Sequence, residues 1–318
     1  MAYMADFKRM SHVYMLCGWH TRSDVPLTGV PTSEHAGQRI DIHIQFASGV
    51  SPVANNAGKV VFEHSNECSR IGLQGVADFE VSRGQRIRIW PAAGASQKDI
   101  EIILFGPAWA TLCHQRGLLP LHASAIVTER GITAFAGHSG VGKSTIAALL
   151  GSLDYELIAD DILPISFDDN SVPGAWPYLR RLKLRSDSIN QLGIVPTERV
   201  SEVLDKEKYF VHPRFAAADR WTKLERLYIL ETSQADSRIS IDVLTGAEAV
   251  HALVDQTYHF PFILNSGLFR EHLAFCTRLA SKIAIYRLRR SLSFDGRKEL
   301  GSVIAAHLGG GEAASALS

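Results

Sequence analysis

A glycine-rich segment at positions 137–144 constrains the fold of this chain more than any other stretch. Its residues, Gly-His-Ser-Gly-Val-Gly-Lys-Ser, fit the pattern GxxxxGK[ST], and an apolar run at 132–136 and a helical run at 144–150 flank it. Glycines let such a loop turn several backbone N–H groups toward one anion, and a helix N-terminus adds partial positive charge. In this context the pattern predicts a strand–loop–helix that binds the phosphates of a nucleotide.

The residues of this loop have separate expected roles, with ATP and Mg²⁺ as the expected cofactors. Lys143 is expected to reach the β- and γ-phosphates and to act as a catalytic charge, and the Ser144 hydroxyl is expected to bind Mg²⁺. The predicted nucleotide-binding residues are Gly137, His138, Ser139, Gly140, Val141, Gly142, Lys143, Ser144 and Thr145.

Composition excludes several classes of protein. The 318 residues carry 33 basic and 33 acidic side chains, so no overall positive field favours a nucleic acid or a membrane surface as partner. No stretch approaches the roughly 18 apolar residues of a membrane span. The four cysteines lie far apart, without the spacing of a metal site or a disulfide framework. We therefore expect a soluble, cytoplasmic protein with free thiols, bound to neither nucleic acid nor membrane.

Three regions are expected along the chain. Residues 1–108 contain alternating runs such as 39–46 and 86–90, which predict a small antiparallel β-rich domain that binds a substrate or partner. Residues 109–308 combine strands and helices around the glycine-rich segment and predict an α/β nucleotide-binding domain of the P-loop type. Residues 309–318, rich in glycine, alanine and serine, are expected to be a disordered tail.

Apolar periodicity predicts the elements of the second region. A hairpin is expected between strands at 118–127 and 132–136. Further strands are expected at 155–159, 227–230, 238–244 and 283–288. Helices are expected at 109–117, 187–193, 269–280 and 297–308. Another helix is expected to begin at Thr245, with a capping box to Glu248.

Two adjacent aspartates follow the expected strand at 155–159. P-loop enzymes carry their metal-binding acid at this place. The pair suggests two roles: Asp161 completes the metal site with Ser144, and Asp160 is the general base. The alternative is that one aspartate only caps the following turn.

A histidine and several basic residues are further candidates. His122 lies on the strand next to that of the loop, where its imidazole could stabilise transferring charge, although a structural role is the alternative. A cation at the phosphates could come from the basic run 180–185, whose basic residues alternate with leucines and could equally form the solvated face of a strand. It could also come from a second basic group at 206–214. The residues are Arg180, Arg181, Lys183, Lys206, Lys208 and Arg214.

These residues together resemble the catalytic domain of the HPr kinase/phosphorylase family, which phosphorylates a serine of the protein HPr. The family's histidine falls on His122, its GxSGxGKS loop on 137–144, and its adjacent aspartates on Asp160 and Asp161. The resemblance implies a serine kinase with Asp160 as base, Asp161 in the metal shell, and a mixed sheet like that of ATP-dependent phosphoenolpyruvate carboxykinase. Relatives form hexamers, which leaves a homo-oligomer open for this chain.

The substrate that the resemblance implies is a serine in a peptide or protein. Residues 179–189 stand where HPr kinases carry a glycine-rich IRGLGI signature, which favours a substrate other than HPr. Segments 23–27, 75–79 and 121–125 are similar to HPr-kinase-like proteins encoded near ribosomal-peptide tailoring genes. Some of those phosphorylate the C-terminal serine of a lasso-peptide precursor, and this is the leading hypothesis. The alternatives are an HPr(Ser) kinase, a small-metabolite kinase and a non-catalytic ATP-sensing regulator.

Overall fold

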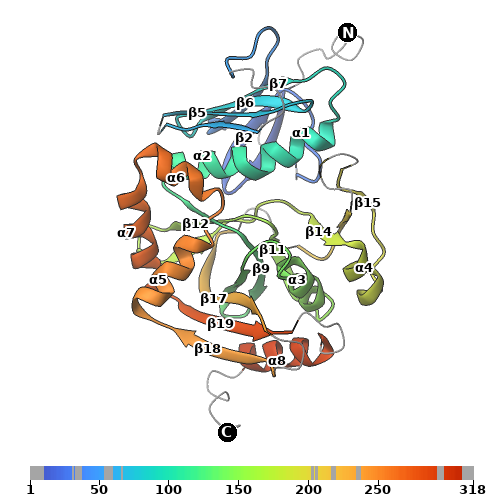
Figure 1. Ribbon diagram of the computed structural model, residues 1–318, viewed down its shortest axis with the longest axis vertical. Helices are drawn as coiled ribbons and strands as arrows, with labels where there is room; N and C mark the ends of the chain where they lie inside the picture. Colours follow the sequence, from blue (N-terminus) through green and yellow to red (C-terminus); the bar gives the residue numbers. More distant parts are fainter. Residues whose placement is uncertain are drawn as a thin grey trace.

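A β-sheet forms one end of the molecule and a larger α/β part forms the rest (Figure 1). This computed structural model describes residues 11–30, 32, 38–53, 60–65, 67–201, 204, 207–215, 220–233, 238–291 and 297–309. Lys206 lies outside the described residues, as does the expected tail from position 310 onward. Within the described part of the chain, no helix is long and apolar enough to cross a membrane.

The N-terminal sheet has seven strands in the described part of the chain, in the order β1-β2-β3-β7-β6-β5-β4. Strand β3 runs parallel to both β2 and β7, and the other neighbours are antiparallel. The expectation of an antiparallel sheet is therefore wrong at its centre, where long connections bring strands back in the same direction. The strands are β1 (His12–Leu16), β2 (Trp19–Ser23), β3 (Ile42–Phe46), β4 (Val61–Glu63), β5 (Cys68–Leu73), β6 (Ala77–Ser82) and β7 (Arg86–Pro91).

A helical segment connects this sheet to the α/β part. It consists of α1 (Gln97–Ile103), the π-helical turn η1 (Leu104–Ala108) and α2 (Trp109–Gln115). The Ser96 hydroxyl caps α1 by accepting a 3.1 Å hydrogen bond from the backbone N–H of Asp99. The β-rich region was expected to extend to position 108, which is wrong from Gln97 onward, because this cap starts a helix whose apolar face is buried. The segment crosses the expected domain border at 108.

The α/β part contains a mixed sheet of nine strands among the described residues. The predicted hairpin is confirmed as the antiparallel pair β9–β10, and β17 lies parallel to both β10 and β19. Strand β11 flanks β9, and β18 flanks β19. The strands are β8 (Leu119–Leu121), β9 (Ala123–Thr128), β10 (Gly131–Ala136), β11 (Glu156–Ala159), β12 (Leu163–Phe167), β13 (Pro173–Ala175), β17 (Thr222–Thr232), β18 (Ser240–Leu244) and β19 (Ala284–Arg290).

Most expected helices of this part are confirmed. They are α3 (Lys143–Gly151), α4 (Ser186–Leu192), α5 (Gly246–Asp255), α7 (Phe269–Ala280) and α8 (Arg297–Gly309). Helix α6 (Phe260–Ser266) was not expected, because it is short and its proline obscures the helical pattern. The capping box on α5 is wrong: the Thr245 side chain makes no cap hydrogen bond, and Glu248 instead accepts a 2.6 Å hydrogen bond from Arg287.

A small antiparallel sheet covers α3 and consists, among the described residues, of β14 (Leu182–Arg185), β16 (Lys208–Val211) and β15 (Glu198–Arg199). Leu182 and Leu184 of β14 are buried against α3, so Lys183 between them points to the opposite side. The expected alternation of this basic run is therefore confirmed, although the face of Lys183 is not simply solvated.

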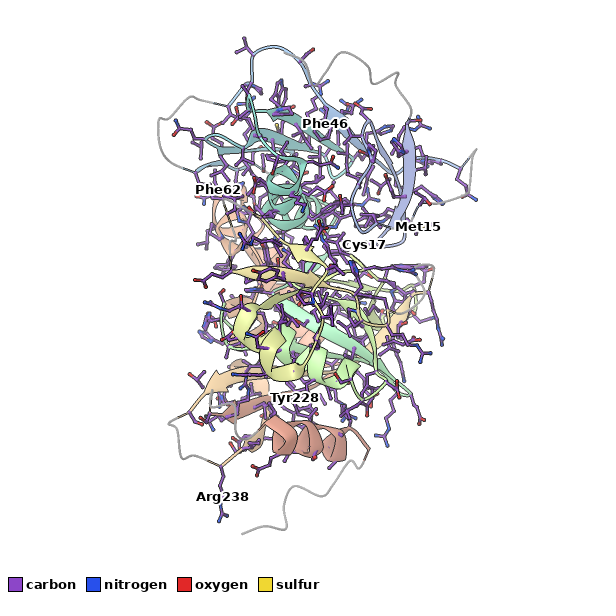
Figure 2. All side chains as sticks on the ribbon, turned by 90° about the vertical axis from the view of Figure 1, so that its right-hand side faces the viewer. Met15, Cys17, Phe46, Phe62, Tyr228 and Arg238 are labelled. Atoms are coloured by element: carbon purple, nitrogen blue, oxygen red, sulfur yellow. The ribbon has the colours of Figure 1, made fainter. Side chains whose placement is uncertain are left out.

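The N-terminal sheet is joined to the α/β part through both backbone and side chains. Cys17, at the junction of the two parts in Figure 2, donates its backbone N–H to the carbonyl of Pro177 at 3.3 Å. Arg181 and Glu101, each with a side chain only 4% exposed, form an ion pair at 3.3 Å. One buried apolar cluster also contains residues from both sides of position 108. The two parts therefore share a core.

Candidate active site

The glycine-rich loop joins the end of β10 to the start of α3, as predicted. Gly142, which directly precedes the helix, has φ +95°, a left-handed conformation that side-chain-bearing residues rarely adopt. A Cβ atom at this position would also collide with the guanidinium of Arg290. The backbone turn therefore favours glycine here, and any side chain at this position would displace the guanidinium of Arg290.

Lys143, the first residue of α3, is folded back onto the loop. Its side chain is buried, and its ammonium donates hydrogen bonds to the carbonyls of Gly137 at 2.7 Å and His138 at 3.1 Å. Burial lowers the pKa of this ammonium to about 8, and the charge of Lys208 acts in the same direction. Asp160 and Asp161 partly oppose this shift. The lysine is thus a cation at the centre of the loop that a bound anion would stabilise.

Asp160 is buried and is held by three hydrogen-bond donors. Its Oδ1 accepts from the hydroxyls of Ser144 at 2.8 Å and Ser124 at 2.6 Å. Its Oδ2 accepts from the backbone N–H of Lys183 at 3.0 Å. The structure therefore places Asp160, rather than Asp161, against the hydroxyl that was expected to bind the metal.

Asp161 faces a different set of partners. Its carboxylate lies 3.0 Å from the Lys183 ammonium and 3.5 Å from Nε2 of His122. Burial alone raises the pKa of this carboxyl, but Lys183 and His122 outweigh it and hold the pKa well below its usual range. About a third of the side chain is exposed (33%), whereas Asp160 is 4% exposed. Asp161 is therefore an ionised carboxylate that a ligand can approach.

A left-handed turn explains why adjacent carboxylates point to different places. Asp161 has φ +71°, and the backbone N–H of Ile162 donates to the carbonyl of Asp160 at 2.9 Å. Aspartate is one of the few side-chain-bearing residues that tolerate this conformation. The turn lets the first carboxylate reach the loop helix and the second reach His122.

His122 lies at the break between β8 and β9, not within a continuous strand as expected. Its backbone N–H donates to the carbonyl of Gln256 at 2.8 Å, which ends the regular pairing of the strand. Its ring meets that of Tyr258 edge to face, with centroids 5.4 Å apart. These contacts direct the imidazole toward Asp161.

The structure distinguishes among the basic residues that were candidates for the phosphate-site cation. Lys183 reaches the aspartate pair, whereas Arg181 pairs with Glu101 and Arg214 pairs with Glu156 at 2.9 Å. The charge of Lys208 also acts on the pKa of Lys143. Lys183 lies directly against the aspartate pair and is therefore a candidate for this cation.

The other predicted loop residues differ in exposure, and Gly137 and Val141 are buried. His138, Ser139 and Gly140 are exposed, and Nε2 of His138 lies 3.3 Å from a carboxylate oxygen of Asp255 on α5. The Thr145 hydroxyl lies 3.1 Å from that of Ser188.

Sequence reasoning missed two residues of the site. The Ser124 hydroxyl on β9 donates a hydrogen bond to Asp160. The sequence pattern that could have indicated this residue is its position two residues after His122, on the same face of the expected strand. Arg290 at the end of β19 donates to the carbonyl of Val141 at 2.7 Å. No local pattern marks Arg290, because 149 positions separate it from its partner.

Fold and site together define an α/β protein in which a glycine-rich strand–loop–helix meets an aspartate pair, a histidine and a lysine. No protein-family model matches the chain, and no curated protein matches its sequence. Matching solved structures include the HPr(Ser) kinase/phosphatase from Coxiella burnetii. That match has 8% sequence identity and a TM-score of 0.30, over 59% of this chain and 95% of that chain. At these values the similarity does not bear on individual residues or on activity.

Proposed function

We propose that the protein is an ATP- and Mg²⁺-dependent phosphotransferase that delivers the γ-phosphate to a serine hydroxyl. The observation that carries the proposal is the 2.8 Å hydrogen bond between Ser144 and Asp160, beside a second carboxylate, Asp161, that faces away from the loop. Phosphoryl transfer needs a site for the metal, positive charge at the phosphates and a proton acceptor for the attacking hydroxyl. The observed arrangement supports all three.

Ser144 and Asp160 fit the metal. A hydroxyl and a carboxylate oxygen are the hard ligands that Mg²⁺ prefers, and Mg²⁺ usually takes only one or two carboxylates beside phosphates and water. When bound, Mg²⁺ neutralises charge on the β- and γ-phosphates. This assignment exchanges the roles expected from the sequence, in which Asp161 was the metal ligand.

Asp161 then becomes the candidate base. Because it is approachable, it can accept a hydrogen bond from the attacking serine and take its proton as the new phosphate bond forms and the bond between the γ-phosphate and ADP breaks. His122 and Lys183 orient this carboxylate, and both carry donors that can stabilise charge on the transferring group. When ATP binds, the ammonium of Lys143 exchanges its hydrogen bonds to the loop carbonyls for contacts with the phosphates.

The acceptor that we propose is a serine of a peptide, with the C-terminal serine of a lasso-peptide precursor as the leading candidate. This part of the proposal is supported by the sequence resemblance described above. We also propose that the N-terminal region, residues 1–108, binds the peptide. Cytoplasmic location would provide both ATP and the reduced state of the four free cysteines.

An acceptor screen tests the proposal. The protein is incubated with ATP and Mg²⁺ together with a lasso-peptide precursor that ends in serine, HPr, and a panel of small hydroxylated metabolites. We expect a mass gain of one phosphate on the peptide serine, and none when that serine is replaced by alanine. ADP release with a metabolite only would contradict the peptide assignment. ATP binding without transfer to any acceptor would favour a nucleotide-sensing regulator.

A further inference from the structure

Arg290 is a buried cation behind the glycine-rich loop. It is the last residue of β19, whose neighbour in the sheet is β17, and β17 lies next to the strand that leads into the loop. The residue is only 7% exposed. Its place in the sheet therefore brings a guanidinium from the C-terminal part of the chain against the phosphate loop.

The contacts of this guanidinium hold the loop backbone. Its Nη2 donates to the carbonyl of Val141 at 2.7 Å, and its Nη1 donates to the carbonyl of Ser291 at 3.1 Å. The space for Nη2 exists only because Gly142 has no side chain. Val141 and Gly142 immediately precede Lys143, so the guanidinium fixes the turn that sets the direction of the loop N–H groups.

The positive charge of Arg290 has no carboxylate partner among the described residues. Its Nε–H is buried and donates no hydrogen bond to any described residue. The neighbouring Arg289 differs, because its side chain is 42% exposed and pairs with Glu231 at 3.2 Å and Asp242 at 2.9 Å. A buried charge without a counter-charge is costly in free energy, and an anion nearby offsets that cost.

We propose that Arg290 is a positioning residue for polyphosphate binding, which both braces the Val141–Gly142 turn and supplies a buried positive charge that the bound phosphates balance. The inference rests on the proposed nucleotide binding and extends it to a residue outside the loop. Planar guanidinium geometry matters for the brace, and the charge matters for the affinity. A lysine would keep the positive charge but lose the planar arrangement of several N–H donors.

Binding of Mg²⁺-ATP and of adenosine by calorimetry tests this proposal, with three variants of the full chain. Arg290→Gln should weaken ATP binding by about tenfold and leave weak adenosine binding unchanged, since only the phosphates interact with the charge. Arg290→Lys should weaken ATP binding by about threefold. Arg289→Gln, which removes an equal charge from the same strand, should stay within about twofold of the wild type.

Four outcomes overturn the inference. If the Arg290→Gln variant binds ATP as tightly as the wild type, the inference about Arg290 is overturned, while the proposed function stands. An equal loss of ATP and adenosine binding indicates a structural role only. Wild-type protein that binds no ATP removes the proposed function and this inference together. If Arg290→Gln does not fold, Arg290→Lys decides, and unchanged ATP affinity in that variant overturns the proposal.

Discussion

The hydroxyl of Ser144 and the carboxylate of Asp160 share a 2.8 Å hydrogen bond, whereas the adjacent Asp161 turns to Lys183 and His122. The left-handed backbone of Asp161 produces this separation. Two carboxylates that are neighbours in the chain thus have different environments, one saturated by donors and one accessible. Groups with contrasting environments can take different chemical roles at one pH.

Lys183 should matter for transfer and not for folding. Replacing it by methionine removes the cation beside Asp161, and we expect phosphate transfer to fall by about 10²-fold while ATP affinity changes little. Steady-state kinetics with the acceptor peptide measures this. Arg185→Met is the control, because Arg185 lies two residues further on the same strand and pairs with Glu207 on the surface. Equal losses in both variants would contradict the assignment.

Binding of ATP should depend on pH through Lys143. Burial lowers the pKa of Lys143 to about 8 in the free protein, and a bound polyphosphate favours the charged lysine. Below this pH the lysine is already protonated, whereas above it ATP binding must be accompanied by proton uptake. ATP affinity should therefore fall as the pH rises above about 8.

Calorimetry in buffers of different ionisation enthalpy measures this proton uptake directly. Lys143→Met should show weaker binding and no uptake in the same pH range. A wild-type affinity that stays constant above the stated pKa would contradict the role of Lys143.

The buried pair between Glu101 and Arg181 should stabilise the junction of the two parts. Glu101 also accepts hydrogen bonds from the backbone N–H of Thr28 at 2.9 Å and from Gln97 at 3.0 Å. Replacing Arg181 by methionine leaves this carboxylate buried without its cation, which should lower the free energy of unfolding by about 3–5 kcal/mol. Chemical denaturation measures the change.

The double variant Glu101→Gln with Arg181→Met is the control for that loss. It removes both charges, and we expect it to regain part of the stability of the single variant. Arg214→Met, which breaks an exposed pair with Glu156, should cost less than about 1 kcal/mol. Equal effects of the two arginine replacements would contradict a buried structural pair.

Local sequence patterns were sufficient for the elements around the loop. The glycine spacing, the apolar strand before it and the helix after it occupy one short stretch, and so does the hairpin β9–β10. Helix α7 was also predicted with its observed limits, because its apolar period is strong over three turns. Each of these features depends on residues close together in the chain.

Other features depend on contacts between distant segments. Periodicity cannot show that β3 is parallel to both of its neighbours, because it contains no information on the direction of the connections. The orientation of the two aspartate side chains depends on one backbone angle at Asp161, which no residue pattern predicts. Arg290 reaches the loop only after β19 has paired with β17.

Comparing the two aspartate variants most directly tests the assignment of a phosphotransfer site. Phosphate transfer from ATP to the serine peptide and Mg²⁺-dependent ATP affinity are measured for Asp160→Asn and Asp161→Asn. We expect Asp161→Asn to lose transfer by about 10²-fold or more with ATP affinity retained. Asp160→Asn should lose the Mg²⁺ dependence of ATP binding. Undiminished transfer by Asp161→Asn, or unchanged Mg²⁺ dependence in Asp160→Asn, would contradict the assigned roles.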